Sequence, residues 1–190
     1  MANANTPRGL EPVRYVSGSP YNGASNVYFV PSSDNTAIYI GGLVKLAGGG
    51  SAEGIPTVTG NVSSGNPVVG VVTGFKAVTQ ESPLYRPAST DRYVYVADDP
   101  DLLFEAQEDG VSVTTVNGAT AQLSGFTSGS TVTGKSSVVI STANISETSD
   151  TDDDVRLVQF VQRSDNEFGL YGRWLVRLNV HQYKDSAVGV

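Results

Sequence analysis

Short apolar stretches separated by turn-forming residues dominate the chain from residue 26 onward. Runs of Val, Ile, Tyr and Phe alternate with Gly, Pro, Asn and Ser. Because β-branched and aromatic residues favour strands while Gly, Pro and Asn favour turns, this pattern is typical of an all-β sandwich or barrel. It predicts strands or short β-prone pieces over residues 26–30, 36–40, 43–47, 55–59, 68–75, 92–97, 102–107, 111–116, 137–141, 155–162 and 173–183.

Alternation along three of these stretches separates two faces, since successive side chains of a strand point to opposite sides. In residues 36–40, 92–97 and 173–183, one face of each stretch carries apolar side chains. These are Ile38 and Ile40 in the first, Val94 and Val96 in the second, and Trp174, Val176, Leu178 and Val180 in the third. The opposite faces carry Tyr39, Tyr93 and Tyr95, and Arg173, Arg177, Asn179 and His181, with Leu175 as an exception. We assign the Trp174 face to the core. Any helix should be short, because no long segment keeps an apolar spacing of 3.6.

The pattern of apolar and turn-forming residues divides the chain into four predicted segments. Residues 1–20 contain Pro7, Gly9 and Pro12 and are predicted to form an extended N-terminal arm. Residues 21–109 form the predicted core, a small β-barrel or sandwich. Residues 110–154 are rich in Gly, Ser and Thr and suggest an insertion or a loose β subdomain, and residues 155–190 suggest a C-terminal β-hairpin that closes the core.

The composition of the chain excludes several classes of binding partner and several kinds of catalytic or metal site. Charged residues make up only 16 % of the 190 residues and the formal net charge is −7, which argues against nucleic acid, because phosphate binding needs clustered Lys and Arg. There is no cysteine, which excludes disulfides, thiolate catalysis and Cys-based metal sites. No apolar run is long enough for a signal peptide or a membrane span, so we expect synthesis in the cytoplasm and no membrane partner.

One stretch matches a phosphate-binding motif formally. Gly129-Ser-Thr-Val-Thr-Gly134-Lys135-Ser136 fits G-x-x-x-x-G-K-[ST] at each specified position. The motif needs a buried strand before it and a helix after it, so that backbone N–H groups converge on the phosphates. Here the following residues 137–141 are strand-like, and we attribute the match to a Gly/Ser/Thr-rich loop.

Two groups of carboxylates could supply oxygen ligands to calcium. They are Asp98, Asp99 and Asp101, and Asp150, Asp152, Asp153 and Asp154. Ordinary turn and loop chemistry explains both groups better, because neither has the Gly and terminal Glu of an EF-hand loop. We therefore expect no metal site and no cofactor.

Catalytic residues are also not expected. His181 is the only histidine, and alternation places it on the polar face of its strand as a solvated side chain. No G-x-S-x-G elbow supports a nucleophilic serine. Paired carboxylates for glycoside hydrolysis are defined by a distance that the sequence does not reveal. Trp174 could form a sugar platform with exposed tyrosines, but its strand face favours the core.

Five segments of the chain carry a resemblance to known proteins. The arm Met1-Ala-Asn-Ala-Asn-Thr-Pro-Arg-Gly-Leu-Glu-Pro-Val-Arg-Tyr15 is similar to the start of tailed-phage virion proteins found beside the major capsid protein. The other four segments are Gly42-Leu-Val-Lys-Leu, Gly54-Ile-Pro-Thr-Val-Thr, Asn66-Pro-Val-Val-Gly-Val-Val-Thr-Gly-Phe75 and Tyr93-Val-Tyr-Val-Ala-Asp-Asp-Pro-Asp-Leu-Leu-Phe-Glu-Ala-Gln107. They resemble the small β-barrel of capsid cement proteins, the head decoration proteins of tailed bacteriophages. Together these stretches cover a little over half of the chain, and residues 110–154 have no counterpart.

The resemblance implies a homotrimer, or less often a dimer, seated on the outer capsid surface of a virion, with extended arms that contact the major capsid protein. Such a protein would be made in the cytoplasm of the host bacterium and would act without catalysis. We expect the arm to order on the capsid by adding strands to an exposed sheet edge. The expected contact residues are Arg8, Leu10, Val13, Arg14 and Tyr15.

Two other functions stay open. A tail-fibre or adhesin-like module would bind host carbohydrate through loops of the same β scaffold, and it predicts a shallow aromatic site. A small hydrolase would need two carboxylates that converge in a pocket.

Overall fold

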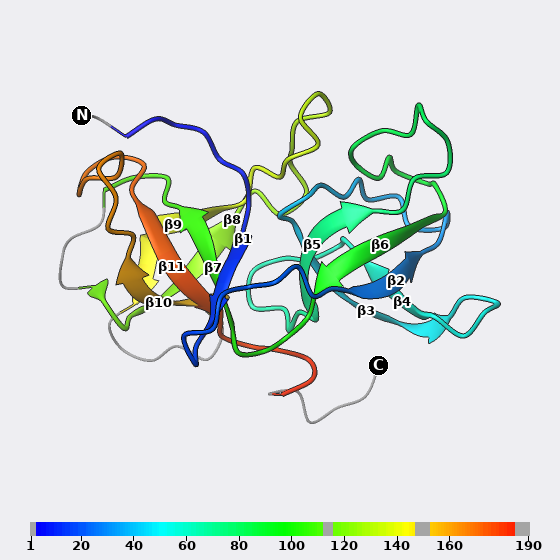
Figure 1. The fold of residues 1–190 in the computed structure, drawn as a ribbon, viewed down its shortest axis with the longest axis horizontal. Coiled ribbons are helices and arrows are strands. Elements are labelled where there is room, and N and C mark those ends of the chain that lie inside the picture. The colour runs from blue at the N-terminus through cyan, green and yellow to red at the C-terminus, as the bar shows by residue number, and fades with distance from the viewer. Residues whose placement is uncertain (1–2, 112–115, 147–152, 185–190) are drawn as a thin grey trace.

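The computed structural model describes residues 3–111, 116–146 and 153–184. Over these residues the chain forms eleven strands and no α-helix, which confirms the all-β prediction. Two β units lie side by side along the long axis of the molecule, a closed barrel and a curved sheet (Figure 1). In the described part of the chain, no helix is long and apolar enough to cross a membrane.

The first unit is a closed five-stranded barrel. It consists of β2 (Asn26–Val30), β3 (Leu43–Gly50), β4 (Pro56–Thr59), β5 (Gly70–Phe75) and β6 (Arg92–Ala97), joined in the order β2-β4-β3-β5-β6. The interior is filled mainly by valines, with Val44, Val58 and Val94 completely excluded from solvent. A five-stranded barrel has a narrow interior, and compact β-branched side chains fill it without the volume of larger residues. Val94 and Val96 point inward and Tyr95 outward, as alternation predicts.

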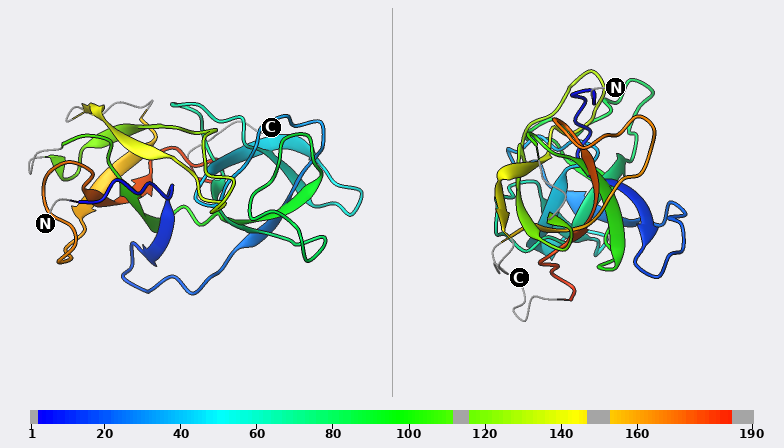
Figure 2. Two further views of the ribbon diagram at one scale, coloured as in Figure 1. Left: turned by 90° about the horizontal axis from the view of Figure 1, so that it is seen from above. Right: turned by 90° about the vertical axis from the view of Figure 1, so that its left-hand side faces the viewer.

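The second unit is a six-stranded antiparallel sheet in the order β1-β7-β11-β10-β8-β9. Its strands are β1 (Glu11–Tyr15), β7 (Leu102–Gln107), β8 (Thr120–Ser124), β9 (Val139–Ser146), β10 (Val155–Phe160) and β11 (Arg173–Leu178). Just past β7, the N–H of Asp109 donates to the carbonyl of Ile140 in β9 at 3.0 Å, so the sheet curves back on itself (Figure 2). The enclosed core surrounds Phe104 and Trp174, both fully buried, which confirms the core assignment of Trp174.

This sheet draws strands from all four segments defined by the sequence. β1 lies in residues 1–20, β7 in 21–109, β8 and β9 in 110–154, and β10 and β11 in 155–190. The Gly/Ser/Thr-rich stretch therefore supplies two strands of a packed sheet. Of the predicted β-prone piece 111–116, residues 112–115 lie outside the described part of the chain, and Val116 is buried in the core of the sheet.

The two units are joined by backbone pairing. The N–H of Ile40 donates to Gly134 and the carbonyl of Ile40 accepts from Ser136, both at 2.8 Å. At a second place, the N–H of Val68 donates to Val180 at 3.2 Å and its carbonyl accepts from Gln182 at 2.8 Å. The core of the sheet continues across this seam into barrel residues, so both units share buried apolar surface.

The predicted strand 36–40 is reduced to two isolated bridges. Ile38 pairs with Arg86 and Ile40 pairs with Lys135. Tyr39 was expected on the face away from the isoleucines, yet it is only 9 % exposed, because its ring stacks on Tyr85 with centroids 5.2 Å apart. Two loops cover both sides of this stretch, and alternation along one segment does not reveal such covering.

The prediction that His181 is solvated is wrong, because its side chain is 1 % exposed. The strand β11 ends at Leu178, earlier than predicted, and the chain then turns across the barrel instead of continuing the alternation. His181 forms a parallel bridge with Val68, and its Nδ1 accepts the N–H of Tyr183 at 3.2 Å. The histidine is therefore part of the seam between the two units.

A fully buried arginine organises the loops at one end of the barrel. The guanidinium of Arg86 donates to four backbone carbonyls at 2.6–2.8 Å, those of Pro31, Asp34, Thr36 and Thr90. The planar fork of a guanidinium can serve several acceptors at once, which an ammonium group cannot do in the same geometry.

Replacing Arg86 with Met should lower the free energy of unfolding by about 3 kcal/mol or more, since the change leaves four carbonyls without their donors. Urea denaturation followed by tryptophan fluorescence measures this loss. Arg8→Met is the matched control, because the Arg8 side chain is 53 % exposed and should change stability by about 0.5 kcal/mol at most. Equal effects of the two substitutions would contradict the role of Arg86.

Asp154 connects the two units through a buried carboxylate. It accepts hydrogen bonds from the N–H of Leu123 in the sheet at 2.7 Å and from the N–H of Gly65 and the hydroxyl of Ser64 in the barrel, each at 2.9 Å. Burial raises the pKa of Asp154 above its ordinary value of 3.8, although the three hydrogen bonds oppose this shift.

Because the folded protein holds the Asp154 proton more tightly than the unfolded chain, this group adds stability as the pH falls through its raised pKa. An Asn at this position does not titrate. The difference in the free energy of unfolding between wild type and Asp154→Asn should therefore move in favour of wild type between about pH 7 and pH 4. Urea unfolding of both proteins across this range measures the trend, and a difference independent of pH would contradict it.

Candidate binding surface

Polar side chains fix the N-terminal arm against the body of the protein. Asn3 donates to the carbonyls of Glu167 and Leu170 at 2.7 and 3.0 Å and accepts the N–H of Glu167 at 2.9 Å. Gln107, at the end of β7, donates to Asn5 and accepts the N–H of Thr6, both at 3.0 Å. Residues 3–10 therefore lie along the end of the sheet beside the loop between β10 and β11. We call residues 3–15 together with residues 161–172 the arm–loop surface.

A close backbone crossing holds the arm where it enters the seam. A Cβ on Gly9 would lie 2.3 Å from the carbonyl oxygen of Gly41, and a Cβ on Gly41 would lie 2.3 Å from that of Arg8. Both glycines have positive φ, at 72° and 85°. The N–H of Leu10 donates to Gly41 at 2.9 Å, and its side chain is 1 % exposed within the core.

The five residues expected from the sequence to contact a partner fall into three environments. Arg8 and Val13 are exposed, and Arg14 and Tyr15 are half-buried. Leu10 is in the core, so in this fold it anchors the arm and offers no outward contact. The structure places Arg8, Val13, Arg14 and Tyr15 along one short stretch of the molecule, at and just before β1.

The outer edge of β1 is already covered by the chain itself. The N–H of Tyr15 donates to Ser19 at 2.8 Å, and the carbonyl of Val13 accepts from Tyr21 at 3.0 Å. Pro12 has no N–H to donate. In this conformation β1 offers no free edge for the strand addition expected from the sequence, and a partner would meet its side chains instead.

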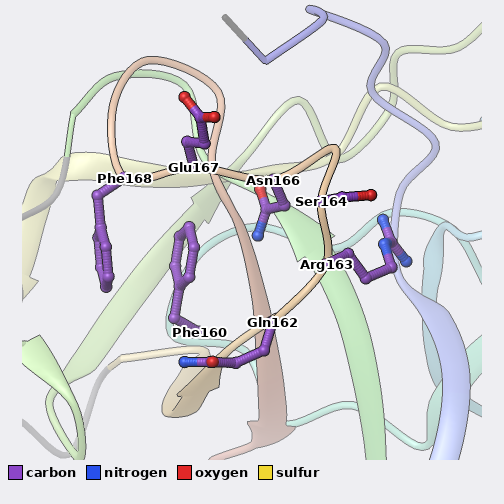
Figure 3. Close-up of a pocket in the computed structure, with 7 residues that line it drawn as sticks. All are labelled: Phe160, Gln162, Arg163, Ser164, Asn166, Glu167 and Phe168. Atoms are coloured by element: carbon purple, nitrogen blue, oxygen red, sulfur yellow. The ribbon is translucent and has the colours of Figure 1, made fainter. Parts of the chain in front are cut away.

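A shallow hollow opens in the arm–loop surface, within the loop between β10 and β11. Its volume is about 480 Å³, and its lining is Phe160, Gln162, Arg163, Ser164, Asn166, Glu167 and Phe168. Phe168 stacks on Phe160 with centroids 3.9 Å apart, and Phe160 meets Trp174 edge-on at 5.1 Å. Phe168 is 47 % exposed, and the close-up shows its ring beside that of Phe160, with Gln162 below (Figure 3).

Ion pairs fix the side of the hollow nearest the arm. Arg163 donates to both oxygens of Glu105 at 2.8 and 3.0 Å, and Arg173 reaches the same carboxylate at 3.1 Å. Arg163 also contacts Asp165 at 3.0 Å. The hydrogen bond that Arg163 donates to Glu105 raises the pKa of Arg163 above its ordinary value, so this guanidinium stays charged.

The phosphate-motif stretch forms a tight turn. Gly129 and Ser136 pair as an antiparallel bridge, and the N–H of Gly134 donates to Ser130 at 2.8 Å. The Nζ of Lys135 pairs with Glu11 at 3.2 Å, and the strand β9 follows. The backbone is therefore closed on itself, and the lysine supports the arm through β1.

The two carboxylate groups are separated by their protein partners. Asp98 accepts from Asn26 and Tyr28, and Asp101 pairs with Arg177 and Lys184. Asp153 and Asp154 are buried and accept from protein donors, while Asp150 and Asp152 lie outside the described residues. Within residues 3–111, 116–146 and 153–184, no group of three or more His, Asp and Glu side chains is arranged to hold a metal ion.

The hollow was not predicted from the sequence. Its lining lies in the connection between two predicted strands, and the exposed Phe168 among polar residues is the one signal available there. Its position next to the arm depends on contacts between residues more than 160 positions apart, such as Asn3 with Glu167.

Comparisons with protein-family models, with curated proteins and with solved structures returned no match for this chain.

Proposed function

We propose that this chain is a non-enzymatic decoration protein of a tailed-phage capsid, which binds the major capsid protein on the outer surface of the virion and acts as a homotrimer. The proposal rests on the resemblance of the arm and barrel segments to cement proteins. The arm–loop surface is the contact face in this proposal, with Arg8, Val13, Arg14 and Tyr15 as the contact residues.

The observation that carries the proposal is the way in which the arm is held. An exposed apolar side chain, Val13, and the two arginines Arg8 and Arg14 stand on a segment that is fixed to a rigid body by the buried Leu10 and by Asn3. Side chains ordered before binding lose less conformational entropy on association, which favours adhesion. A protein that bridges capsid subunits stabilises their expanded lattice by its higher affinity for that form.

The net charge of −7 also supports a protein partner over nucleic acid. In addition, the described carboxylates of both Asp groups are engaged by protein donors, which does not favour the hydrolase alternative.

Val13→Glu should weaken capsid binding at least about ten-fold, because a carboxylate would have to be buried against the partner. The measurement is the occupancy of purified, undecorated capsids, read by co-sedimentation and cryo-electron microscopy. Val27→Glu in β2 is the matched control, since Val13 and Val27 are both strand valines with 39 % exposure.

If Val27→Glu abolishes binding while Val13→Glu does not, the contact face lies on the barrel and the arm–loop surface is wrong. No binding of wild type to any capsid would refute the function itself. Light scattering of the free protein tests the trimer, and a strict monomer at capsid-saturating concentrations would remove that part of the proposal.

A second candidate function is supported by the hollow. A tail-fibre or adhesin-like module would bind host carbohydrate, and here an exposed Phe168 ring lines one hollow together with polar residues that include Gln162 and Ser164. Sugars bind to aromatic faces through their C–H groups and to amides and hydroxyls through their own hydroxyls, so this chemistry fits a saccharide.

If the carbohydrate function holds, Phe168→Ala should abolish binding on a glycan array, because it removes the stacking surface. Leu170→Ala is the matched control, since Leu170 belongs to the same loop, is 55 % exposed and does not line the hollow. Absence of glycan binding by the wild-type protein would remove this candidate.

A further inference from the structure

Three cations gather around a small hollow at the C-terminal end of β11. The hollow has a volume of about 240 Å³ and is lined by Arg156, Arg177, Leu178, Asn179 and Lys184. Its lining residues Leu178 and Asn179 stand where the chain, drawn in red, leaves the strand β11 (Figure 1). The whole chain has only 12 Lys and Arg residues and a net charge of −7, so this concentration of positive charge is unusual for the molecule.

The arrangement of the two arginines is unfavourable without a further anion. Arg156 in β10 and Arg177 in β11 are direct partners in the antiparallel register. Like charges placed opposite each other across two strands destabilise a sheet. Among the described residues, the guanidinium of Arg156 has no hydrogen-bond or ion-pair partner. No carboxylate of the described residues therefore pairs with its charge.

Among the described residues, Asp101 is the one carboxylate paired with these cations, with Arg177 at 2.5 Å and Lys184 at 2.9 Å. The buried carboxylate of Asp153 accepts from Thr120, and that of Asp154 accepts from Leu123, Gly65 and Ser64. Three cations therefore share one paired carboxylate. By contrast, the ion pairs at the other end of β11 balance two arginines, Arg163 and Arg173, with Glu105 and Asp165.

We propose that this hollow binds a phosphate group, either as the free ion or carried by a small organic molecule. A phosphate monoester carries about −1.5 to −2 charges at pH 7 and so matches the surplus of the site. Guanidinium groups present paired N–H donors to phosphate oxygens, and the lysine adds a point charge. The amide of Asn179 donates to the carbonyl of Asp153 at 2.9 Å, which fixes the floor of the hollow. The positive field of the site agrees with one titrating group, since the hydrogen bond from Lys184 holds the pKa of Asp101 below its ordinary value.

The site does not depend on the proposed capsid function. Along β11, Arg173 beside Glu105 and Arg177 at the hollow are four residues apart, or about 13 Å in an extended strand. Loss of phosphate binding would leave the capsid proposal intact, and failure to bind a capsid would leave the phosphate proposal intact.

The experiment is calorimetric titration of the full chain with inorganic phosphate, with sodium chloride at matched ionic strength as the reference. Wild type should show saturable binding at one site. Arg156→Gln should weaken binding about ten-fold, the loss expected for a charge-assisted hydrogen bond. Arg8→Gln removes the same charge far from the hollow and should bind like wild type.

Asp101→Asn provides a test of opposite sign. Removing this carboxylate takes one negative charge away from the three cations and should tighten phosphate binding, whereas a general loss of structure would weaken it. Titration with glycerol phosphate then separates the two sources. If glycerol phosphate binds as tightly as inorganic phosphate, the site accepts a phosphate group carried by an organic molecule. If only inorganic phosphate binds, the ligand is the free ion.

No saturable binding by wild type, or equal affinities for Arg156→Gln and Arg8→Gln, would overturn the proposal.

Discussion

The seam between the barrel and the sheet is the constraint on which the rest of the structure depends. Neither unit is independent, because the sheet core continues into barrel residues such as Leu43 and Val71. Backbone pairing at Ile40 and at Val68 satisfies polar groups that would otherwise be buried without partners. The arm enters at the same seam through the Gly9–Gly41 crossing, so this junction also fixes the point from which the arm extends.

Buried polar groups give the seam and the loops a single arrangement. Arg86 ties loops to each other through four carbonyls, and Asp154 ties the barrel to the sheet through three donors. A buried group of this kind costs desolvation energy and recovers it only when all its partners are in place. Such groups therefore disfavour alternative packings of the many short, similar valine-rich strands.

The sequence predicted the local structure well and the pairing poorly. Alternation identified strands such as Arg92–Ala97 and the inward side of Val94 and Val96, because that signal lies within a few neighbouring residues. It missed β8 in Thr120–Ser124, where polar residues dilute the apolar pattern. It also placed His181 in solvent, because burial there comes from the barrel across the seam and not from the strand itself. The cation cluster arises from strand register, which single-sequence patterns do not specify. The hollow beside the arm lies in a loop held by contacts with distant residues, such as that of Glu167 with Asn3.

The strand β11 shows how register converts the same residue type into different chemistry. Arg173 and Arg177 lie on one face of the strand, two alternations apart. Arg173 lies next to Glu105 of β7, and a shared carboxylate locks it into the frame of the arm–loop surface. Arg177 lies opposite Arg156 of β10, so its surroundings repel positive charge and attract an anion. A shift of one strand by two residues would keep both arginines on the same face and yet remove this difference. The functional character of each end therefore follows from the pairing of strands far apart in sequence, and not from the arginines alone.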